Sequence, residues 1–348
     1  MKNFILCFFY LTNLSFCALK AQDIPLPEHP RPDFERTDWE NLNGSWKFGF
    51  DSLDTGIKDQ WFSNTNHFPL TIKVPFPWGS PLSGVPDKAD IGWYQKNITV
   101  KPDWKDKRIF ITVGASDWES SIWLDDQLVG THQGGYIPFS FELTKYIQTG
   151  KEHSITIRVD DKRRLFTLYG KQGYGNARGI WQTIYLDARG KDYIDAFKFI
   201  PDIDVNKVKV EVDFSEVSTV ERKVNVDIQT PDGAINGILS VKPGFAKGTL
   251  DINIPNPRLW DLEDPYLYMV NLSHAGDKVN TYFGMRKISV TNLPGTNYPY
   301  ISLNNKPVYL QLTLDQSYHP DGFYTFPSDE FMKNEIQMTK DLGLNGLR

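Results

Sequence analysis

The sequence predicts a mainly β protein: two antiparallel β-sandwich domains followed by a single β-α-β unit. Short runs of alternating apolar and polar residues, such as residues 108–113 (RIFITV), put one face of a strand in a core and the other in water. Turn residues separate these runs at the spacing typical of sandwiches. A helical pattern of useful length occurs only near the end of the chain, at residues 327–343.

The first predicted domain spans residues 22–190. It has no useful helical period, and Asp125-Asp126 separates two of its runs in the manner of a hairpin turn. We therefore expect an antiparallel sandwich or jelly roll. The other alternating runs are residues 46–50, 121–124, 153–159 and 183–186.

The second predicted domain spans residues 191–292. Turn signals such as Pro231-Asp232-Gly233 separate its strands, and about 100 residues with about seven strands are typical of an immunoglobulin-like domain. Cys7 and Cys17, the two cysteines of the chain, both precede the first domain, so we expect no disulfide in either sandwich. The predicted strands are residues 205–214, 222–229, 248–254, 266–272 and 279–283.

The third region, residues 293–348, changes character. A strand is predicted over residues 301–312, and a helix begins after Ser328, whose hydroxyl suits the N-cap position. Gly343 is placed to end that helix, and residues 344–348 begin a second extended segment. Two strands connected by a helix are expected to pair in parallel, but one such unit cannot cover both faces of a sheet. We therefore expect this region to be the start of an incomplete domain.

Residues 1–21 are typical of a secretory signal peptide. A positive start at Lys2 precedes an apolar stretch, residues 4–11, that is too short to span a membrane. We expect cleavage after Ala21 and export to the periplasm or medium, with no membrane span. Lipid attachment at Cys17 stays open as an alternative, although Phe16 is bulkier than the residue usual before a lipidated cysteine. The net charge of −5 offers no electrostatic basis for binding nucleic acid.

Several strings, taken in order along the chain, resemble glycoside hydrolase family 2. The most specific of them is residues 121–139 (SIWLDDQLVGTHQGGYIPF). The resemblance implies a jelly-roll sugar-binding domain, an immunoglobulin-like domain and the opening β-α-β of a (β/α)8 barrel, here truncated. The other strings are 42–48 (LNGSWKF), 92–96 (GWYQK), 179–182 (GIWQ), 256–260 (NPRLW), 264–268 (DPYLY), 283–286 (FGMR), 303–308 (LNNKPV) and 342–348 (LGLNGLR).

The resemblance also implies a reaction, the retaining hydrolysis of β-glycosides through a covalent glycosyl-enzyme intermediate. That reaction needs two carboxyl groups about 5–5.5 Å apart. In the family both are Glu residues on later barrel strands, so they are expected beyond Arg348. Glu330 and Glu335 match neither position, and we expect the chain to be inactive alone.

The substrates implied are oligo- or polysaccharide β-glycosides, with β-galactosides favoured. Residues 314–322 (LDQSYHPDG) depart from the His-containing segment that many members have, which leaves β-glucuronides and β-mannosides as alternatives. No cofactor or metal ligand is assigned to this chain. The resemblance leaves open a Mg²⁺ or Na⁺ ion and a homo-oligomer for the full-length enzyme.

Candidate substrate-binding residues follow the first strand of the implied barrel, where barrel active sites form. These are Asp315, Gln316 and His319. A carboxylate and an amide at that place suit adjacent sugar hydroxyls. The alternative interpretation is a solvated loop with an Asx turn at Asp321-Gly322.

In the first domain the resemblance points to Asp161, which follows a strand. A turn-capping aspartate is the competing interpretation. Lys171-Gln172 is a weaker candidate, set against a solvated loop. Trp123 and Trp181 occur within alternating strands, so we expect core packing rather than stacking on sugars. For Trp118, in a turn, the two interpretations balance.

Two rival hypotheses remain. One is a stand-alone carbohydrate-binding protein of two β domains, and the other is a structural β-sandwich adhesin. Neither has a use for the amphipathic helix and second extended segment at residues 328–348, so this segment favours the enzyme.

Overall fold

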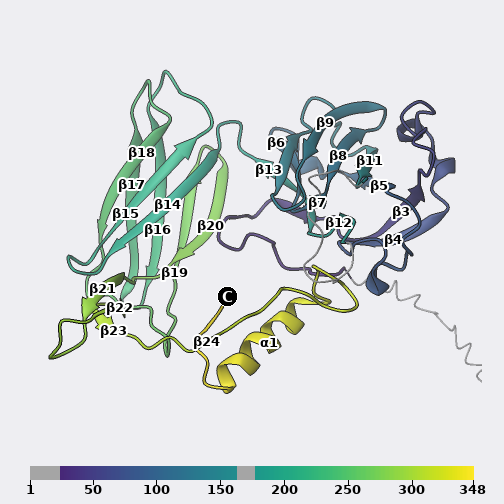
Figure 1. The fold of residues 1–348 in the computed structure, drawn as a ribbon. Coiled ribbons are helices and arrows are strands. Elements are labelled where there is room, and N and C mark those ends of the chain that lie inside the picture. Colours follow the sequence, from purple (N-terminus) through teal and green to yellow (C-terminus); the bar gives the residue numbers. More distant parts are fainter. Residues whose placement is uncertain (1–23, 163–176) are drawn as a thin grey trace, which may run out of the picture.

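The computed structural model describes residues 24–162 and 177–348, and β-strands dominate it as predicted (Figure 1). Two sandwiches lie side by side, and the C-terminal helix runs below the gap between them (Figure 1). Residues 1–21 and Lys171-Gln172 lie outside the described residues.

The first sandwich is built from two main antiparallel sheets. A six-stranded sheet has the order β4-β3-β5-β11-β8-β9, and a four-stranded sheet has the order β10-β6-β13-β2. A short pair, β12 with β7, accompanies them. The strands are β2 (Trp39–Asn41), β3 (Gly44–Phe50), β4 (Leu70–Val74), β5 (Ile91–Thr99), β6 (Arg108–Val113), β7 (Ser116–Asp117), β8 (Glu119–Leu124), β9 (Gln127–Gln133), β10 (Phe139–Glu142), β11 (Glu152–Asp160), β12 (Gly179–Ile180) and β13 (Ile184–Arg189), with short 3-10 helices at Trp61–Ser63, Thr65–His67, Pro81–Ser83 and Pro102–Trp104.

The alternating runs of the first sandwich face a common core as predicted. Trp46 and Trp78 are fully buried in it, and Trp123 lies against Trp93 and Phe62 in an adjoining cluster. The predicted hairpin turn is confirmed: Leu124 pairs with Gln127 across it. The tryptophans at positions 46, 78, 93, 104 and 123 are thus buried side chains of the interior, and core packing of Trp123 is confirmed.

The second sandwich also has two antiparallel sheets. A five-stranded sheet has the order β1-β20-β19-β16-β17, and a three-stranded sheet has the order β14-β15-β18. Their inner faces bury a separate core rich in valine. The strands are β1 (Glu35–Arg36), β14 (Ile194–Asp202), β15 (Lys207–Phe214), β16 (Arg222–Thr230), β17 (Gly233–Val241), β18 (Lys247–Asn253), β19 (Tyr268–His274) and β20 (Asp277–Phe283).

The last region begins with a small antiparallel sheet: β21 (Ile288–Asn292), β22 (Pro299–Leu303) and β23 (Lys306–Pro307). The prediction of one strand over residues 301–312 is wrong. Asn304 and Asn305 have φ values of 50° and 63°, so the chain turns back there and a hairpin replaces the continuous strand. Asparagine tolerates this left-handed conformation better than most residues.

A strand-helix-strand unit closes the described chain. Strand β24 (Leu312–Thr313) pairs in parallel with β25 (Gly346–Leu347), and α1 (Asp329–Asp341) connects them. The helix boundaries match the prediction, since the Ser328 hydroxyl accepts a hydrogen bond from the Phe331 amide and Gly343 has a φ of 79° just past the helix end.

The segment before β2 joins the two sandwiches, which the sequence did not predict. Strand β1 pairs with β20 of the second sandwich, whereas β2, which follows after two intervening residues, pairs with β13 of the first. Arg36, the last residue of β1, is almost fully buried, and its guanidinium donates to both carboxylate oxygens of Asp277 at 2.9 and 3.2 Å. It also donates to the Ile194 carbonyl at 2.6 Å and lies 3.5 Å from the Asp187 carboxylate in β13.

We expect Arg36→Met to destabilise the protein strongly. The substitution keeps the aliphatic part of the side chain but leaves the carboxylates of Asp277 and Asp187 buried with one cation fewer. Breaking a buried ion pair in this way costs about 3–5 kcal/mol. Urea denaturation followed by tryptophan fluorescence measures the change in the free energy of unfolding.

Arg31→Met is the matched control. Arg31 forms a similar bidentate pair with Asp33, but both side chains are 51% exposed. An exposed pair contributes at most about 1 kcal/mol, so this variant should unfold near the wild-type midpoint. Equal losses in the two variants would contradict the role given to Arg36.

Candidate functional site

The loop after β24 returns to the first sandwich and docks on it. The buried Thr325 hydroxyl lies 3.1 Å from the Pro75 carbonyl and 2.5 Å from the Trp181 carbonyl. The Leu82 amide donates to the Asp321 carbonyl at 2.9 Å. A segment about 140 residues further along the chain than Trp181 thereby becomes part of the same surface (Figure 1).

Three aromatic rings meet where this loop docks. The ring centres of Tyr136, Trp181 and Tyr324 are 5.6 to 6.3 Å apart. The Trp181 indole donates to the Gly135 carbonyl at 2.8 Å, which holds the glycine-containing loop after β9 against the cluster. Burial raises the pKa of both tyrosines, and the nearby Tyr324 and Asp117 raise that of Tyr136 further.

Asp161, the candidate in the first sandwich, is buried beside this cluster. Its backbone amide donates to the Asp90 carbonyl at 2.8 Å, and its carboxylate lies 3.8 Å from the Arg178 guanidinium. Its charge is the smallest of the contributions that raise the pKa of Tyr136. Asp161 is therefore a buried, ion-paired carboxylate rather than a residue of a solvated turn.

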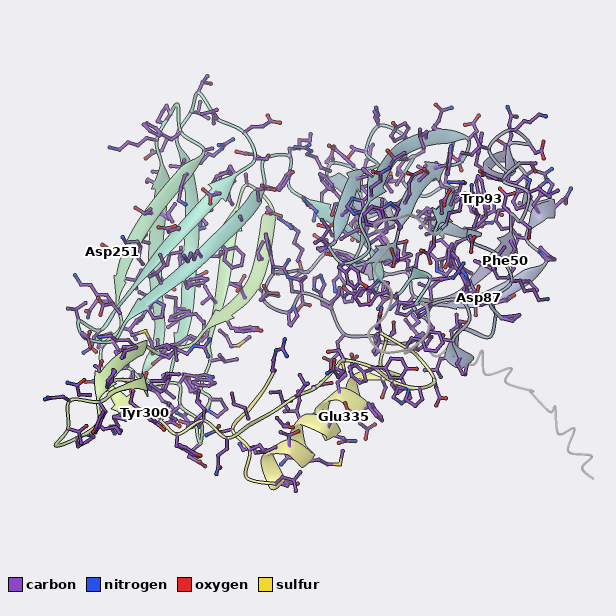
Figure 2. The ribbon with its side chains drawn as sticks, in the orientation of Figure 1. Phe50, Asp87, Trp93, Asp251, Tyr300 and Glu335 are labelled. Atoms are coloured by element: carbon purple, nitrogen blue, oxygen red, sulfur yellow. The ribbon has the colours of Figure 1, made fainter. Side chains whose placement is uncertain are left out.

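Arg178 is the cation that pairs with Asp161 and with two neighbouring carboxylates. It forms ion pairs with Asp90 and, at 3.4 Å, with Asp87, in addition to Asp161 (Asp87 is labelled in Figure 2). Burial alone would lower the pKa of Arg178, but the three carboxylates outweigh it and raise the pKa. We call the set Asp161, Arg178, Tyr136, Trp181 and Tyr324 the junction site.

The structure places the other candidates differently. Asp315 and Gln316 are exposed, and the Asp315 carboxylate accepts a hydrogen bond from the Ser317 amide at 2.7 Å. Asp315 also borders a hollow of about 350 Å³ whose opposite wall includes Glu335 of α1 (labelled in Figure 2). An Asx turn thus forms at Asp315 itself, three residues beyond the start of β24.

His319 shapes the loop. Its Nδ1 accepts a hydrogen bond from the Asp321 amide at 3.1 Å, and its ring lies edge-on against Phe331 with centres 4.9 Å apart. These contacts join the loop to the first turn of α1. The binding roles of Asp315, Gln316 and His319 stay predictions.

The sequence reasoning missed four residues of the junction site as site members: Arg178, Tyr136, Trp181 and Tyr324. One signal was available, since Tyr136 follows Gly134-Gly135 in the most specific family-like string and is 54% exposed. Tyr324 carried no comparable signal, because its neighbours come from elements far away in the sequence.

Among residues 24–162 and 177–348, no group of three His, Cys, Asp or Glu side chains is arranged to hold a metal ion. No helix among those residues is long and apolar enough to cross a membrane.

Comparison with known proteins identifies the family. Residues 39–186 match the description "Glycosyl hydrolases family 2, sugar binding domain", and residues 193–286 match "Glycosyl hydrolases family 2". Together these matches cover well over half of the chain. The chain belongs to glycoside hydrolase family 2. The resemblance inferred from the sequence is thereby confirmed.

Relatives within family 2 carry more than one name. A β-glucuronidase of Bacteroides fragilis is 25% identical over 339 residues, covering 88% of this chain and 45% of the relative. A β-galactosidase of Oenococcus oeni is 23% identical over 354 residues, covering 89% of this chain and 33% of the relative. The crystal structure of Ruminococcus gnavus β-glucuronidase has a TM-score of 0.73 at 18% identity, covering 93% of this chain and 56% of that one. The family 2 chain therefore spans less than half of these two curated relatives, and the structural likeness shows the fold alone.

We expect Thr325→Val to loosen the loop after β24. Losing the hydroxyl leaves the Pro75 and Trp181 carbonyls without this donor, at a cost of about 1–3 kcal/mol. Hydrogen exchange of the amides in residues 319–325 should then speed up by about 5- to 100-fold.

Thr296→Val serves as the control, because its hydroxyl bonds the Leu293 carbonyl within an exposed turn. Exchange in residues 319–325 should be unchanged in that variant. Unchanged exchange in Thr325→Val as well would show that the loop docks without this contact.

Proposed function

We propose that this chain supplies the sugar-binding and immunoglobulin-like domains of an exported, retaining β-glycosidase, together with the first β-α-β unit of its (β/α)8 barrel. One observation carries the proposal: in a family 2 chain, after the two sandwiches and the small sheet β21-β22-β23, α1 connects two parallel strands. Parallel pairing through a helix is the repeating unit of such barrels. A binding module or adhesin of two sandwiches has no use for it.

The exposed apolar side chains of this unit support the barrel assignment. Leu312 and Leu347, on the two paired strands, are 55% and 41% exposed. Ile336, Met338 and Leu342 on or beside α1 are exposed as well. Barrel strands are normally covered on both faces, so this exposure fits a unit that packs against further strands and helices.

We place the sugar ring at the junction site, bordered by the loop after β24. Asp161 offers a carboxylate that accepts hydrogen bonds from adjacent sugar hydroxyls, and Tyr136 and Trp181 offer ring faces for the apolar side of a pyranose. Asp315, Gln316 and His319 belong to the same loop and are proposed as further contacts. The loop is the element that ties the barrel's first strand end to the sugar-binding domain.

The two carboxylates of the reaction are proposed to lie outside residues 22–348. Glu330 and Glu335 belong to α1, and helices of a barrel lie outside the ring of strands on whose ends the site forms. The residues of this chain therefore bind and orient the substrate, and they do not themselves supply a nucleophile and an acid about 5–5.5 Å apart.

β-Galactosides are the favoured substrates on grounds of charge. Around Arg178 the described residues include three carboxylates, those of Asp87, Asp90 and Asp161. This excess of negative charge disfavours the carboxylate of a hexuronate. β-Glucuronides are the second candidate, because the Bacteroides fragilis relative is named for them.

The purified chain should not hydrolyse aryl β-galactosides or aryl β-glucuronides. The reason is the proposed absence of both reacting carboxylates from this chain. Release of nitrophenol from the two substrates measures the activity, with a commercial β-galactosidase and β-glucuronidase as positive controls. Turnover of either substrate by the purified chain would overturn the assignment, and its loss in Glu330→Gln or Glu335→Gln would show that a carboxylate of α1 takes part in the reaction.

The protein isolated from its source should start at Gln22. Cleavage after Ala21 follows from the proposed signal peptide, which also implies export. Mass spectrometry of the N-terminal peptide from secreted and periplasmic fractions measures the start. A diacylglyceryl group on Cys17, lost in Cys17→Ser and kept in the matched Cys7→Ser, would establish the lipid-anchored alternative instead.

A further inference from the structure

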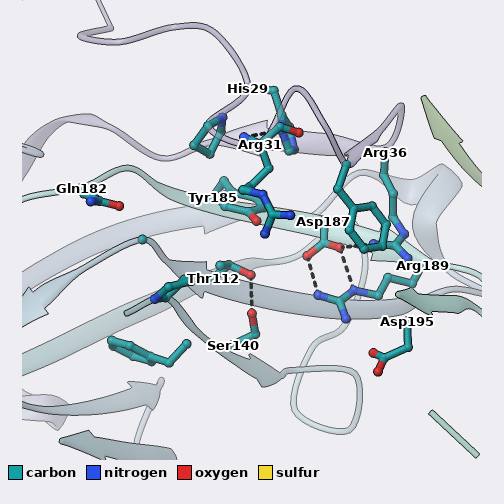
Figure 3. Close-up of a pocket in the computed structure, with 15 residues that line it drawn as sticks. His29, Arg31, Arg36, Thr112, Ser140, Gln182, Tyr185, Asp187, Arg189 and Asp195 are labelled. Atoms are coloured by element: carbon teal, nitrogen blue, oxygen red, sulfur yellow. Dashed lines mark hydrogen bonds and ion pairs between the residues drawn. The ribbon is translucent and has the colours of Figure 1, made fainter. Parts of the chain in front are cut away.

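A pocket lined by both polar and apolar side chains lies on the first sandwich, at its border with strands β1 and β14 of the second. It opens over the sheet β10-β6-β13-β2, beneath the segment that precedes β1, and has a volume of about 240 Å³ (Figure 3). This is slightly below the range of about 300–1,000 Å³ typical of small-molecule sites. One sugar ring fits such a space, and a longer chain would extend into solvent.

The floor of the pocket carries a preformed set of hydroxyl groups. The Thr112 and Ser140 hydroxyls lie 2.7 Å apart on neighbouring strands, and the Tyr185 phenol lines the same pocket (Figure 3). The Tyr185 ring is held edge-on by His29, with ring centres 5.3 Å apart. Because these groups are already ordered, a ligand would lose little free energy in ordering them.

Two polar side chains at the rim have unused hydrogen-bonding capacity. Gln182 and Asp195 are both exposed and line the pocket (Figure 3). Within residues 24–162 and 177–348, no hydrogen bond or ion pair involves either side chain. An amide supplies two donors and an acceptor, and a carboxylate supplies acceptors only. This combination matches hydroxyl groups, each of which both donates and accepts.

The charges of the pocket argue against an anionic ligand. Three guanidinium groups line it, but each already has a carboxylate partner: Arg31 pairs with Asp33, Arg36 with Asp277, and Arg189 with Asp187. Asp195 adds a carboxylate that has no described cation of its own. A carboxylate or phosphate ligand would therefore meet no unpaired cation and one unpaired anion.

From this geometry we propose that the pocket binds a neutral hexose unit, free or at the end of an oligosaccharide. Gln182 and Asp195 hold its hydroxyls at the rim, and the Thr112–Ser140 pair contacts it at the floor. The site is independent of the proposed hydrolysis, because it shares no residue with the junction site. Its role is to hold a sugar against the face of the domain beside the second sandwich.

Saturation-transfer NMR on the purified chain tests the site, with galactose, glucose and lactose as neutral probes and glucuronate as the anionic probe. We expect millimolar binding of at least one neutral probe, and weaker binding of glucuronate. Gln182→Met and Asp195→Leu should each weaken it by about three- to tenfold, as expected for one lost hydrogen bond. Both positions are exposed, so the urea midpoint should stay at its wild-type value.

Gln229→Met is the matched control, since Gln229 is an exposed glutamine on β16 of the other sandwich. It should leave binding unchanged. Asp161→Asn separates this proposal from the junction site: sugar binding lost in that variant but kept in Gln182→Met and Asp195→Leu would overturn the pocket assignment. No binding of any neutral probe at about 10 mM, or tighter binding of glucuronate, would overturn it as well.

Discussion

The architecture depends on one buried cation, Arg36. Its guanidinium lies between carboxylates of two different sandwiches, Asp277 at the start of β20 and Asp187 in β13. The Asp277 carboxylate also accepts hydrogen bonds from the Ile194 amide, where the second sandwich begins. A buried guanidinium or carboxylate without a partner is costly. The Arg36 guanidinium can pair with Asp277 and Asp187 together only when the two sandwiches keep this relative placement. This network sets the geometry of the linker and of the pocket beside it.

A second, weaker connection closes the other end of the molecule. The loop after β24 docks on the first sandwich through hydrogen bonds from Thr325 and to Asp321, and through the contact of Tyr324 with Trp181. The last region is thus connected to both sandwiches. It continues the chain from the second sandwich, and it contacts the first through the loop after β24. A sugar held at the junction site would touch elements from both ends of the chain.

Local rules predicted the elements well where one face of a segment meets one core. Period-two alternation identified β6, β8, β11 and β16, and a serine N-cap with a following glycine identified both ends of α1. The failure at residues 301–312 has a local cause as well: two successive asparagines adopt positive φ and reverse the chain. Strand β1 was missed because two residues carry no periodicity, and its pairing is decided by β20, which lies some 240 residues away.

The sequence by itself determined the fold class, the order of the domains, the helix and the family, because each of these is written in contiguous strings or local periods. It also brought Asp161 forward as a candidate. Only the tertiary structure decided which side chains Asp161 meets, that Asp315 caps its own turn, and that the rings of Tyr136 and Tyr324 lie together with centres 6.3 Å apart. The physical reason is that a site and an interdomain ion pair are made by groups far apart in sequence, and no local pattern records the distance between them.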